Sequence, residues 1–226
     1  MLAVILESGR LLQYATNPSK RGNPSMKLYI TPTSPYGRVA RIIVAEKNLG
    51  AQLEIIHAQT RQADSPYYRI NPSGRVPYLV RDDGLGMEDS QLIALYLDGL
   101  GRGPRLTIDL AAQDWTYGRL ESYARSMLDG ISVWVREMRR PENERSPTIL
   151  RHEHDRCLRM ADFWEREINH ATMAGPLVMA QLLLIAALDF AAFGRMAELE
   201  ANRPKLAAWA QRLRAIPSIA ATTPNA

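Results

Sequence analysis

A glycine-rich stretch near the middle of the chain divides the sequence into two parts with different hydrophobic patterns. It consists of Gly99-Leu100-Gly101-Arg102-Gly103-Pro104, and such a cluster of glycine and proline is typical of a linker. Before it, short strand-like runs alternate with helical patterns. After it, the periodic segments all have helical spacing. We therefore expect an α/β domain over 26–101 and an all-α domain over 107–226.

The segments within each part follow from their periodicity and from their start and stop residues. In the first part we expect strands at 27–30, 53–56, 76–80 and 85–87, and helices at 35–49, 65–70 and 90–97. In the second part we expect helices at 107–139, 146–172, 177–194 and 203–214. Residues 1–25 contain a cluster of helix-breaking residues around Asn17-Pro18-Ser19 and are interpreted as a dispensable N-terminal extension.

Composition excludes several classes of function. The net charge of +4 comes from basic residues interspersed with acids, as in Glu165-Arg166-Glu167, so we expect no nucleic-acid partner. The apolar runs are too short to span a bilayer, so we expect no membrane partner. Cys157 is the only cysteine, which rules out an intrachain disulfide and fits a reducing cytoplasmic setting. His152 and His154 fall on different faces of their helix, and we expect no metal site.

The segment 71–80 and the pair Asp89-Ser90 carry most of the functional information. The run Asn71-Pro72-Ser73-Gly74-Arg75-Val76-Pro77 combines a turn, a restrained X-Pro bond and the start of a strand. An acid and a hydroxyl follow at a helix N-terminus, which can hold an anionic group. This combination is suited to binding a small peptide-like ligand by its backbone.

Several motifs, in order and in register, resemble the cytosolic glutathione transferase family over residues 26–226. They are Thr33-Ser34-Pro35-Tyr36-Gly37-Arg38, Asn71 to Pro77, Asp89-Ser90 followed by Ile93 and Tyr96-Leu97, and Leu206 to Thr222. Arg139-Arg140-Pro141-Glu142 is similar to a bacterial subgroup with serine at the active-site turn. The resemblance implies a thioredoxin-like N-terminal domain, an all-α C-terminal domain and a homodimer. It also implies a detoxifying transferase that joins the thiolate of glutathione, its co-substrate, to small hydrophobic electrophiles.

The resemblance implies a binding role for five residues. A cis peptide bond before Pro77 directs the backbone of Val76 toward the cysteinyl part of glutathione, the alternative being an ordinary trans proline. Ser90 and the helix amides suit the γ-glutamyl carboxylate, and Asp89 suits the adjacent ammonium. Arg75 is a candidate for the glycyl carboxylate, with Arg61 or Gln62 as rivals.

Ser34 is the candidate catalytic residue. The thiol of glutathione has a pKa of about 8.5, and lowering it by two units takes about 2.7 kcal/mol. A hydrogen bond to a charged group supplies about 1.5–3 kcal/mol, and a helix N-terminus about 0.3–1 kcal/mol. A hydroxyl at the start of the helix could therefore supply most of the shift. Thr33 and Tyr36 are rival hydroxyls, and Ser34 could also be a simple helix cap.

Two departures from the family pattern stand out. Asp89 replaces the usual glutamate, which keeps the carboxylate. Val178 replaces the usual capping serine or threonine before Met179-Ala180-Gln181, which predicts a less stable helix start. The alternatives to a transferase are a non-catalytic glutathione- or partner-binding module on the same fold, and a glutathione-dependent peroxidase.

Overall fold

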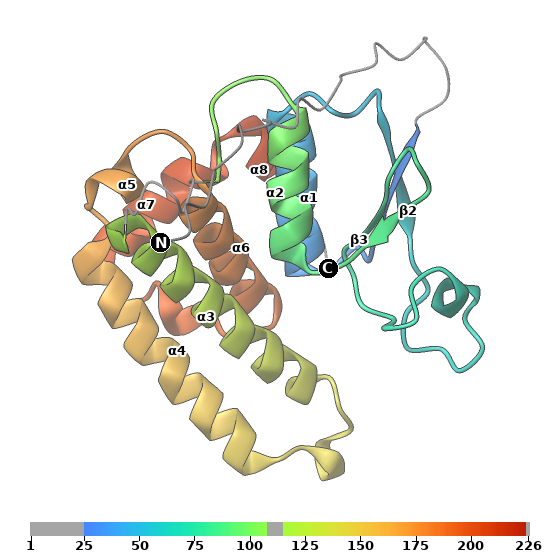
Figure 1. The fold of residues 1–226 in the computed structure, drawn as a ribbon. Coiled ribbons are helices and arrows are strands. Elements are labelled where there is room, and N and C mark those ends of the chain that lie inside the picture. The colour runs from blue at the N-terminus through green and yellow to red at the C-terminus, as the bar shows by residue number, and fades with distance from the viewer. Residues whose placement is uncertain (1–24, 108–114, 225–226) are drawn as a thin grey trace, which may run out of the picture.

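The first part of the chain forms a mixed four-stranded sheet in the computed structural model, which describes residues 25–107 and 115–224 (Figure 1). The expectation about residues 1–25 lies almost entirely outside this described range. The elements of this part are β1 (Met26–Ile30), α1 (Pro35–Glu46), β2 (Leu53–His57), the 3-10 helix η1 (Pro66–Arg69), β3 (Tyr78–Val80), β4 (Gly86–Met87) and α2 (Ser90–Leu100).

The strand order β2-β1-β3-β4 places the first strand in the interior of the sheet. Strand β1 runs parallel to β2 and antiparallel to β3, and β4 closes the sheet as an antiparallel edge strand. Leu28 lies opposite Leu79 across the β1–β3 pair, and both side chains are fully buried. This is the thioredoxin-like arrangement that the resemblance implied. Strand β3 begins two residues later than predicted, after Pro77, which has no N–H to donate to a ladder.

Helices α1 and α2 lie side by side against the sheet, and both begin at the same end of the first domain, at the lower ends of these two helices in Figure 1. The apolar residues of α1 that face inward, Ile42 and Ile43, are fully buried, as are Ile93 and Leu97 of α2. Because both N-termini lie at one end, the partial positive charges of two helices act on the same region. That end also contains the loops that precede each helix.

A buried ion pair attaches the linker to the ends of these two helices. The ammonium of Lys47 lies 2.7 Å from the Asp98 carboxylate, and both side chains are almost inaccessible to solvent. Asp98 also accepts hydrogen bonds from the backbone N–H groups of Leu106 (3.1 Å) and Thr107 (3.0 Å). Lys47 donates to the carbonyl of Pro104 at 2.6 Å. The predicted linker is therefore held by charge and by backbone hydrogen bonds.

The second part of the described chain is helical. Its elements are α3 (Trp115–Met138), η3 (Glu142–Glu144), α4 (Pro147–Glu167), α5 (Ala171–Ala174), α6 (Met179–Phe193), η4 (Ala197–Leu199), α7 (Pro204–Arg214) and α8 (Pro217–Ala220). Helix α6 is central: the residues from Met179 to Ala191 are all buried, and it packs against α3, α1 and α7. Among the described helices, none combines the length and hydrophobicity needed to cross a lipid bilayer.

Two of the expected helices have different boundaries. The helix expected over 107–139 is α3, which is described from Trp115, and residues 108–114 lie outside the described range. The helix expected over 146–172 is interrupted, because α4 ends at Glu167 and α5 starts at Ala171. His170 has an extended backbone, and its Nδ1 accepts the N–H of Thr172. This local hydrogen bond starts a new helix instead of continuing the old one.

Gln181 compensates for the missing cap at the start of α6. Its Oε1 accepts the N–H of Val178 at 3.2 Å. Its Nε2 lies within hydrogen-bond distance of the carbonyls of Thr172 (3.1 Å), Met173 (3.1 Å) and Gly175 (3.3 Å). The side chain is buried. Although valine cannot cap the helix, the amide of Gln181 pairs the backbone groups around the helix start, so the predicted weakness is at least partly offset.

Replacing Gln181 with methionine is expected to lower the free energy of unfolding by about 1–3 kcal/mol, because buried backbone groups lose their partner. Urea denaturation of the variant measures this loss. Gln211→Met on the exposed face of α7 is the matched control and should change the stability by less than about 0.5 kcal/mol. Equal losses in the two variants would contradict this account of the helix start.

Candidate functional site

Ser34 lies at the N-cap of α1, immediately after β1 and its loop. Its Oγ accepts the backbone N–H of Gly37 at 3.0 Å, and Pro35 occupies the first helical position. Gly37 allows α1 to start close to β1, because a Cβ there would lie 3.1 Å from the side chain of Ile30, which would have to shift slightly. The Ser34 side chain is half-buried. The cap that the sequence allowed is present, and it leaves the hydroxyl proton free to donate to another group.

Tyr36, a rival to Ser34, is already engaged. Its hydroxyl donates a hydrogen bond to the carboxylate of Asp129, on α3. Burial, with the hydrogen bond to Asp129 as a second cause, raises the pKa of Tyr36 well above its usual value. The phenol therefore stays neutral, and its proton is directed toward α3. Sequence reasoning missed Asp129, since its contact joins residues far apart in the chain.

The segment before β3 has a cis peptide bond between Val76 and Pro77, as predicted. The carbonyl of Arg75 accepts hydrogen bonds from the hydroxyl of Tyr67 (2.5 Å) and the side-chain amide of Asn71 (3.0 Å). By contrast, the N–H and C=O of Val76 have no hydrogen-bond partner among the described residues, and Val76 is half-buried. A half-buried backbone unit without partners at the start of a strand can pair with an extended ligand.

The turn of residues 71–74 is fixed to the start of α2 by a residue that sequence reasoning missed. The Glu88 carboxylate accepts hydrogen bonds from the hydroxyl of Ser73 and, at 3.3 Å, from the amide of Asn71. Gly74 has φ +67, and a Cβ there would lie 2.7 Å from the ring of Tyr68. Glu88 directly precedes the predicted Asp89, but its role depends on a contact that the sequence does not indicate.

Asp89 is the N-cap of α2 and has an unusual backbone conformation, with φ +73 and ψ 124. Its Oδ1 accepts the N–H of Gln91 at 2.7 Å. A non-glycine residue at positive φ costs of order 1–3 kcal/mol, and such residues cluster at functional sites. Ser90, the first residue of α2, is half-buried. The conformation of Asp89 thus places a carboxylate and a hydroxyl at a helix N-terminus.

The fold brings most of the predicted site residues to one end of the first domain. The N-termini of α1 and α2 lie next to each other (Figure 1). Strand β1 leads into the loop that contains Ser34, and β3 directly follows Val76 and Pro77; these two strands are neighbours in the sheet. Ser34, Val76, Asp89 and Ser90 belong to these segments. Arg75 is exposed and makes no ion pair with a described residue, so the geometry does not favour it over Arg61.

The first turn of α1 also contacts the helical domain through a buried charge network. The Arg38 guanidinium lies 2.8 Å from the Asp189 carboxylate of α6. Arg214 of α7 lies 2.6 Å from the same carboxylate and also binds Glu200. The burial of Arg38 lowers its pKa, and Asp189 opposes that effect. This network fixes the start of α1 relative to the helices of the second domain.

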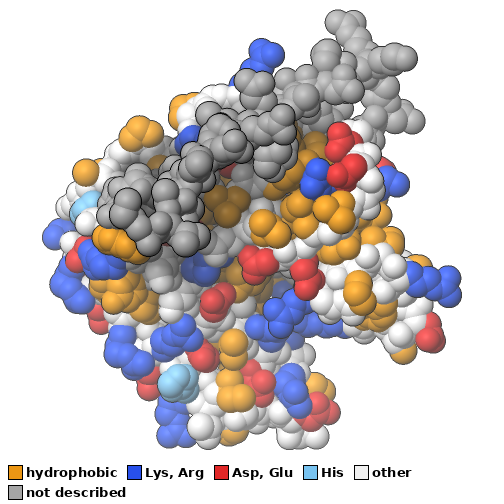
Figure 2. Space-filling view, in the orientation of Figure 1, with side chains coloured by type: hydrophobic (Ala, Val, Ile, Leu, Met, Phe, Trp, Pro, Cys, Tyr) orange, Lys and Arg blue, Asp and Glu red, His pale blue; other side chains and the backbone are white. Residues whose placement is uncertain are grey.

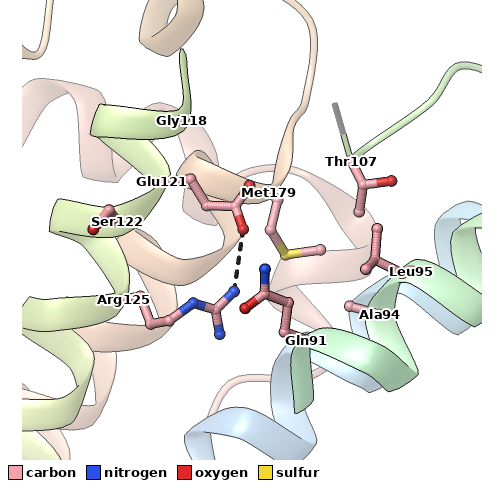
Figure 3. Close-up of a pocket in the computed structure, with 9 residues that line it drawn as sticks. All are labelled: Gln91, Ala94, Leu95, Thr107, Gly118, Glu121, Ser122, Arg125 and Met179. Atoms are coloured by element: carbon pink, nitrogen blue, oxygen red, sulfur yellow. Dashed lines mark hydrogen bonds and ion pairs between the residues drawn. The ribbon is translucent and has the colours of Figure 1, made fainter. Parts of the chain in front are cut away.

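A cavity of about 270 Å³ lies elsewhere, between α2, α3 and the start of α6 (Figure 3). An ion pair between Arg125 and Glu121, at 3.1 Å, faces Gln91 and Met179 there. A second cavity, of about 240 Å³, is lined by residues of β1, β2 and η1, including His57 and Tyr67. The predicted site residues line neither cavity.

Comparisons with known proteins agree with this fold. Residues 28–105 match the family described as glutathione S-transferase, N-terminal domain. A glutathione transferase family member from Pseudomonas fluorescens, solved with bound glutathione, superimposes with a TM-score of 0.80 at 24% identity, covering 89% of this chain and 100% of that chain. The fold is that of the glutathione transferases.

Two sequence relatives match this chain over most of its length and over most of their own length. The "Uncharacterized GST-like protein YibF" of Escherichia coli is 29% identical over 201 residues, covering 88% of this chain and 98% of the relative. Glutathione S-transferase 2 of Saccharomyces cerevisiae is 26% identical over 214 residues, covering 90% and 91%. The chain is thus similar to glutathione transferases and GST-like proteins over most of its length.

Proposed function

We propose that this protein is a glutathione transferase that conjugates glutathione to small hydrophobic electrophiles. The observation that carries the proposal is the backbone of Val76, which has no hydrogen-bond partner among the described residues. It lies beside the cis Pro77, at the same end of the domain as the N-termini of α1 and α2. An extended peptide can add its own N–H and C=O to Val76 as a short strand. The ligand found in the Pseudomonas fluorescens structure is a peptide of this kind.

Each end of glutathione then meets a suitable group. The γ-glutamyl carboxylate binds Ser90 and the amides at the start of α2, and the ammonium pairs with Asp89. Pro77 sets the direction in which the Val76 backbone faces the cysteinyl unit. Arg75 remains a candidate for the glycyl carboxylate. These assignments use groups that have no competing ion pair with a described residue.

Ser34 is proposed to stabilise the thiolate. The thiol gives up its proton to solvent water, the Ser34 hydroxyl donates a hydrogen bond to the sulfur, and the N-terminus of α1 adds a favourable field. The sulfur then forms a bond to an electrophilic carbon, and either a leaving group departs or a carbanion takes up a proton. The engagement of Tyr36 with Asp129 supports Ser34 as the donor.

Calorimetric titration with glutathione, followed by assays with an aryl halide, an enone and an organic hydroperoxide, tests the function. Glutathione binding with turnover of the halide or enone is the expected result. Binding without turnover of any of them would favour the non-catalytic binding module, and turnover of the hydroperoxide alone would favour a peroxidase. Absence of glutathione binding would contradict the transferase and the peroxidase and would leave only a partner-binding module.

We also propose that the protein is a cytoplasmic homodimer. Large apolar side chains are exposed on α2 and α3, including Leu92 (49%), Leu95 (43%) and Tyr123 (39%), and such surfaces favour association. The single cysteine, Cys157, is buried and unpaired, which is compatible with a reducing compartment. Sedimentation equilibrium should give twice the mass of the chain, and a purely monomeric protein at micromolar concentration would contradict the dimer.

A further inference from the structure

The first turn of α1 is joined to the second domain at two points. Arg38 is buried, and it contacts Asp189 of α6 at 2.8 Å and the carbonyl of Ile219 at 3.3 Å. Tyr36 is half-buried, and its hydroxyl donates to the carboxylate of Asp129 in α3. Because α1 otherwise packs mainly against α2 and α6, the bond between Tyr36 and Asp129 connects the start of α1 to a further helix, α3.

Tyr36 lies in the same turn as the two backbone groups that fix Ser34. The Oγ of Ser34 accepts the N–H of Gly37 at 3.0 Å, and the carbonyl of Ser34 accepts the N–H of Arg38 at 2.9 Å. These donors directly follow Tyr36 in the chain. A shift of the Tyr36 backbone would therefore move both donors, and with them the direction in which the Ser34 hydroxyl can donate its own proton.

Asp129 is explained by this contact with α1. It lies in the interior of α3, and among the described residues it has the hydrogen bond to Tyr36 and no ion pair. Aspartate is one of the poorer helix-forming residues, because its side chain competes for backbone hydrogen bonds. The residue is exposed, and Figure 2 shows charged side chains of both signs where the lower ends of α1 and α2 face α3.

We propose that Asp129 is a positioning residue for the reaction: through Tyr36 it holds the first turn of α1, and with it the Ser34 hydroxyl, in the orientation that stabilises the thiolate. The proposal rests on the proposed function and adds a residue of the second domain to it. A hydrogen bond weakens steeply when its distance and angle are wrong, and a displacement of about 1 Å can greatly reduce catalysis. Asp129 itself contacts neither the sulfur nor the electrophile.

Three variants break or keep this contact. Asp129→Ala removes the acceptor, Tyr36→Phe removes the donor but keeps the ring, and Asp129→Asn keeps an oxygen that can accept the same hydrogen bond. Asp162→Ala is the matched control, because Asp162 is also an exposed aspartate within a long helix and binds a distant residue, Arg203, at 2.8 Å. For each protein we would measure the thiol pKa and the dissociation constant of bound glutathione, and kcat with an aryl halide.

Asp129→Ala and Tyr36→Phe are each expected to raise the pKa of the bound thiol by about 0.5 to 1. At about pH 6, where the thiolate is the minor form, kcat should fall by about 3- to 10-fold, while the dissociation constant of glutathione stays nearly unchanged. The double variant should lose no more than either single variant, because both remove one bond. Asp129→Asn and Asp162→Ala should stay close to the wild type.

The direction of the pKa change separates positioning from a simple effect of charge. A carboxylate that acted only through its charge would disfavour a nearby thiolate, so its removal would lower the thiol pKa. A lower thiol pKa in Asp129→Ala would therefore overturn the proposal. A raised thiol pKa in Tyr36→Phe together with a normal one in Asp129→Ala would also overturn it, because Tyr36 would then be the donor to the sulfur.

A purely structural contact would give a third result. If Asp129→Ala and Tyr36→Phe lose stability but keep the wild-type thiol pKa and kcat, the positioning role is refuted, and Tyr36→Phe decides alone if Asp129→Ala does not fold. If Ser34→Ala raises the thiol pKa while these variants do not, the proposed function stands and the positioning role falls. If the wild type does not lower the thiol pKa of bound glutathione, both fall.

Discussion

Replacing Ser34 with alanine is expected to lower kcat/KM for an aryl halide by about 10- to 100-fold near neutral pH, the equivalent of one hydrogen bond to a charged group. The loss should appear in the chemical step, because the thiolate loses its donor. The dissociation constant of glutathione should change little, since Val76, Asp89 and Ser90 still bind its backbone and its γ-glutamyl end. Steady-state kinetics and calorimetry on the same preparation separate these two quantities.

A stability control is needed, because Ser34 also caps α1. Ser146 provides it: this residue caps α4 in the same Ser-Pro arrangement, with its Oγ accepting the N–H of Ile149 at 3.3 Å. Ser34→Ala and Ser146→Ala should each cost about 1 kcal/mol of folding stability. Only Ser34→Ala should reduce activity. Equal activity in the two variants would remove Ser34 from the mechanism.

Replacing Asp98 with asparagine is expected to cost about 3–5 kcal/mol of folding stability, because it leaves the buried ammonium of Lys47 without a counter-charge. Burial by itself raises the pKa of Asp98, but hydrogen bonds from Lys47, Thr107 and Leu106 outweigh it and lower the pKa. A carboxyl group with a depressed folded-state pKa stabilises the fold above its unfolded pKa of about 3.9. This stabilising contribution is lost as the pH falls through the lower pKa that Asp98 has in the folded state.

Urea denaturation across a pH series tests this prediction. The difference in unfolding free energy between the wild type and Asp98→Asn should be largest near neutral pH and should shrink in acid. Asp82→Asn, in the exposed turn before β4, is the control and should stay within about 0.5 kcal/mol of the wild type. A constant difference down to the lowest pH would show that the charge of Asp98 is not the cause.

The parts of the fold that could be predicted from the sequence depend on local patterns. Pro35 and Ser34 mark the start of α1, and Asp89 marks the start of α2, because caps and helix-breaking residues act within a few positions. The cis bond before Pro77 followed from the family resemblance. The almost wholly apolar run that becomes α6 indicates a buried helix, because a helix with no continuous polar face cannot leave one side in water.

The parts that could not be predicted depend on contacts between distant segments. Asp129 lies on a helix far along the chain from Tyr36, and no spacing rule connects them. Glu88 looks like an ordinary acid beside Asp89 until the turn of residues 71–74 folds back onto it. Gln181 occupies the glutamine position of a capping box, but its hydrogen bonds to the carbonyls of Thr172 and Met173 depend on the turn before α6. Local patterns thus indicate the caps and turns around the candidate site, but not the distant partners that orient its side chains.

The most direct test of the central claim is the pKa of the glutathione thiol when it is bound to the protein. Ultraviolet absorbance of the thiolate, followed across a pH series with protein in excess of glutathione, measures this value. The account predicts a thiol pKa about two units below the free value of about 8.5 in the wild type, and a return most of the way to that value in Ser34→Ala. A bound thiol that titrates like free glutathione, or one whose pKa is equally low in both proteins, would contradict the account.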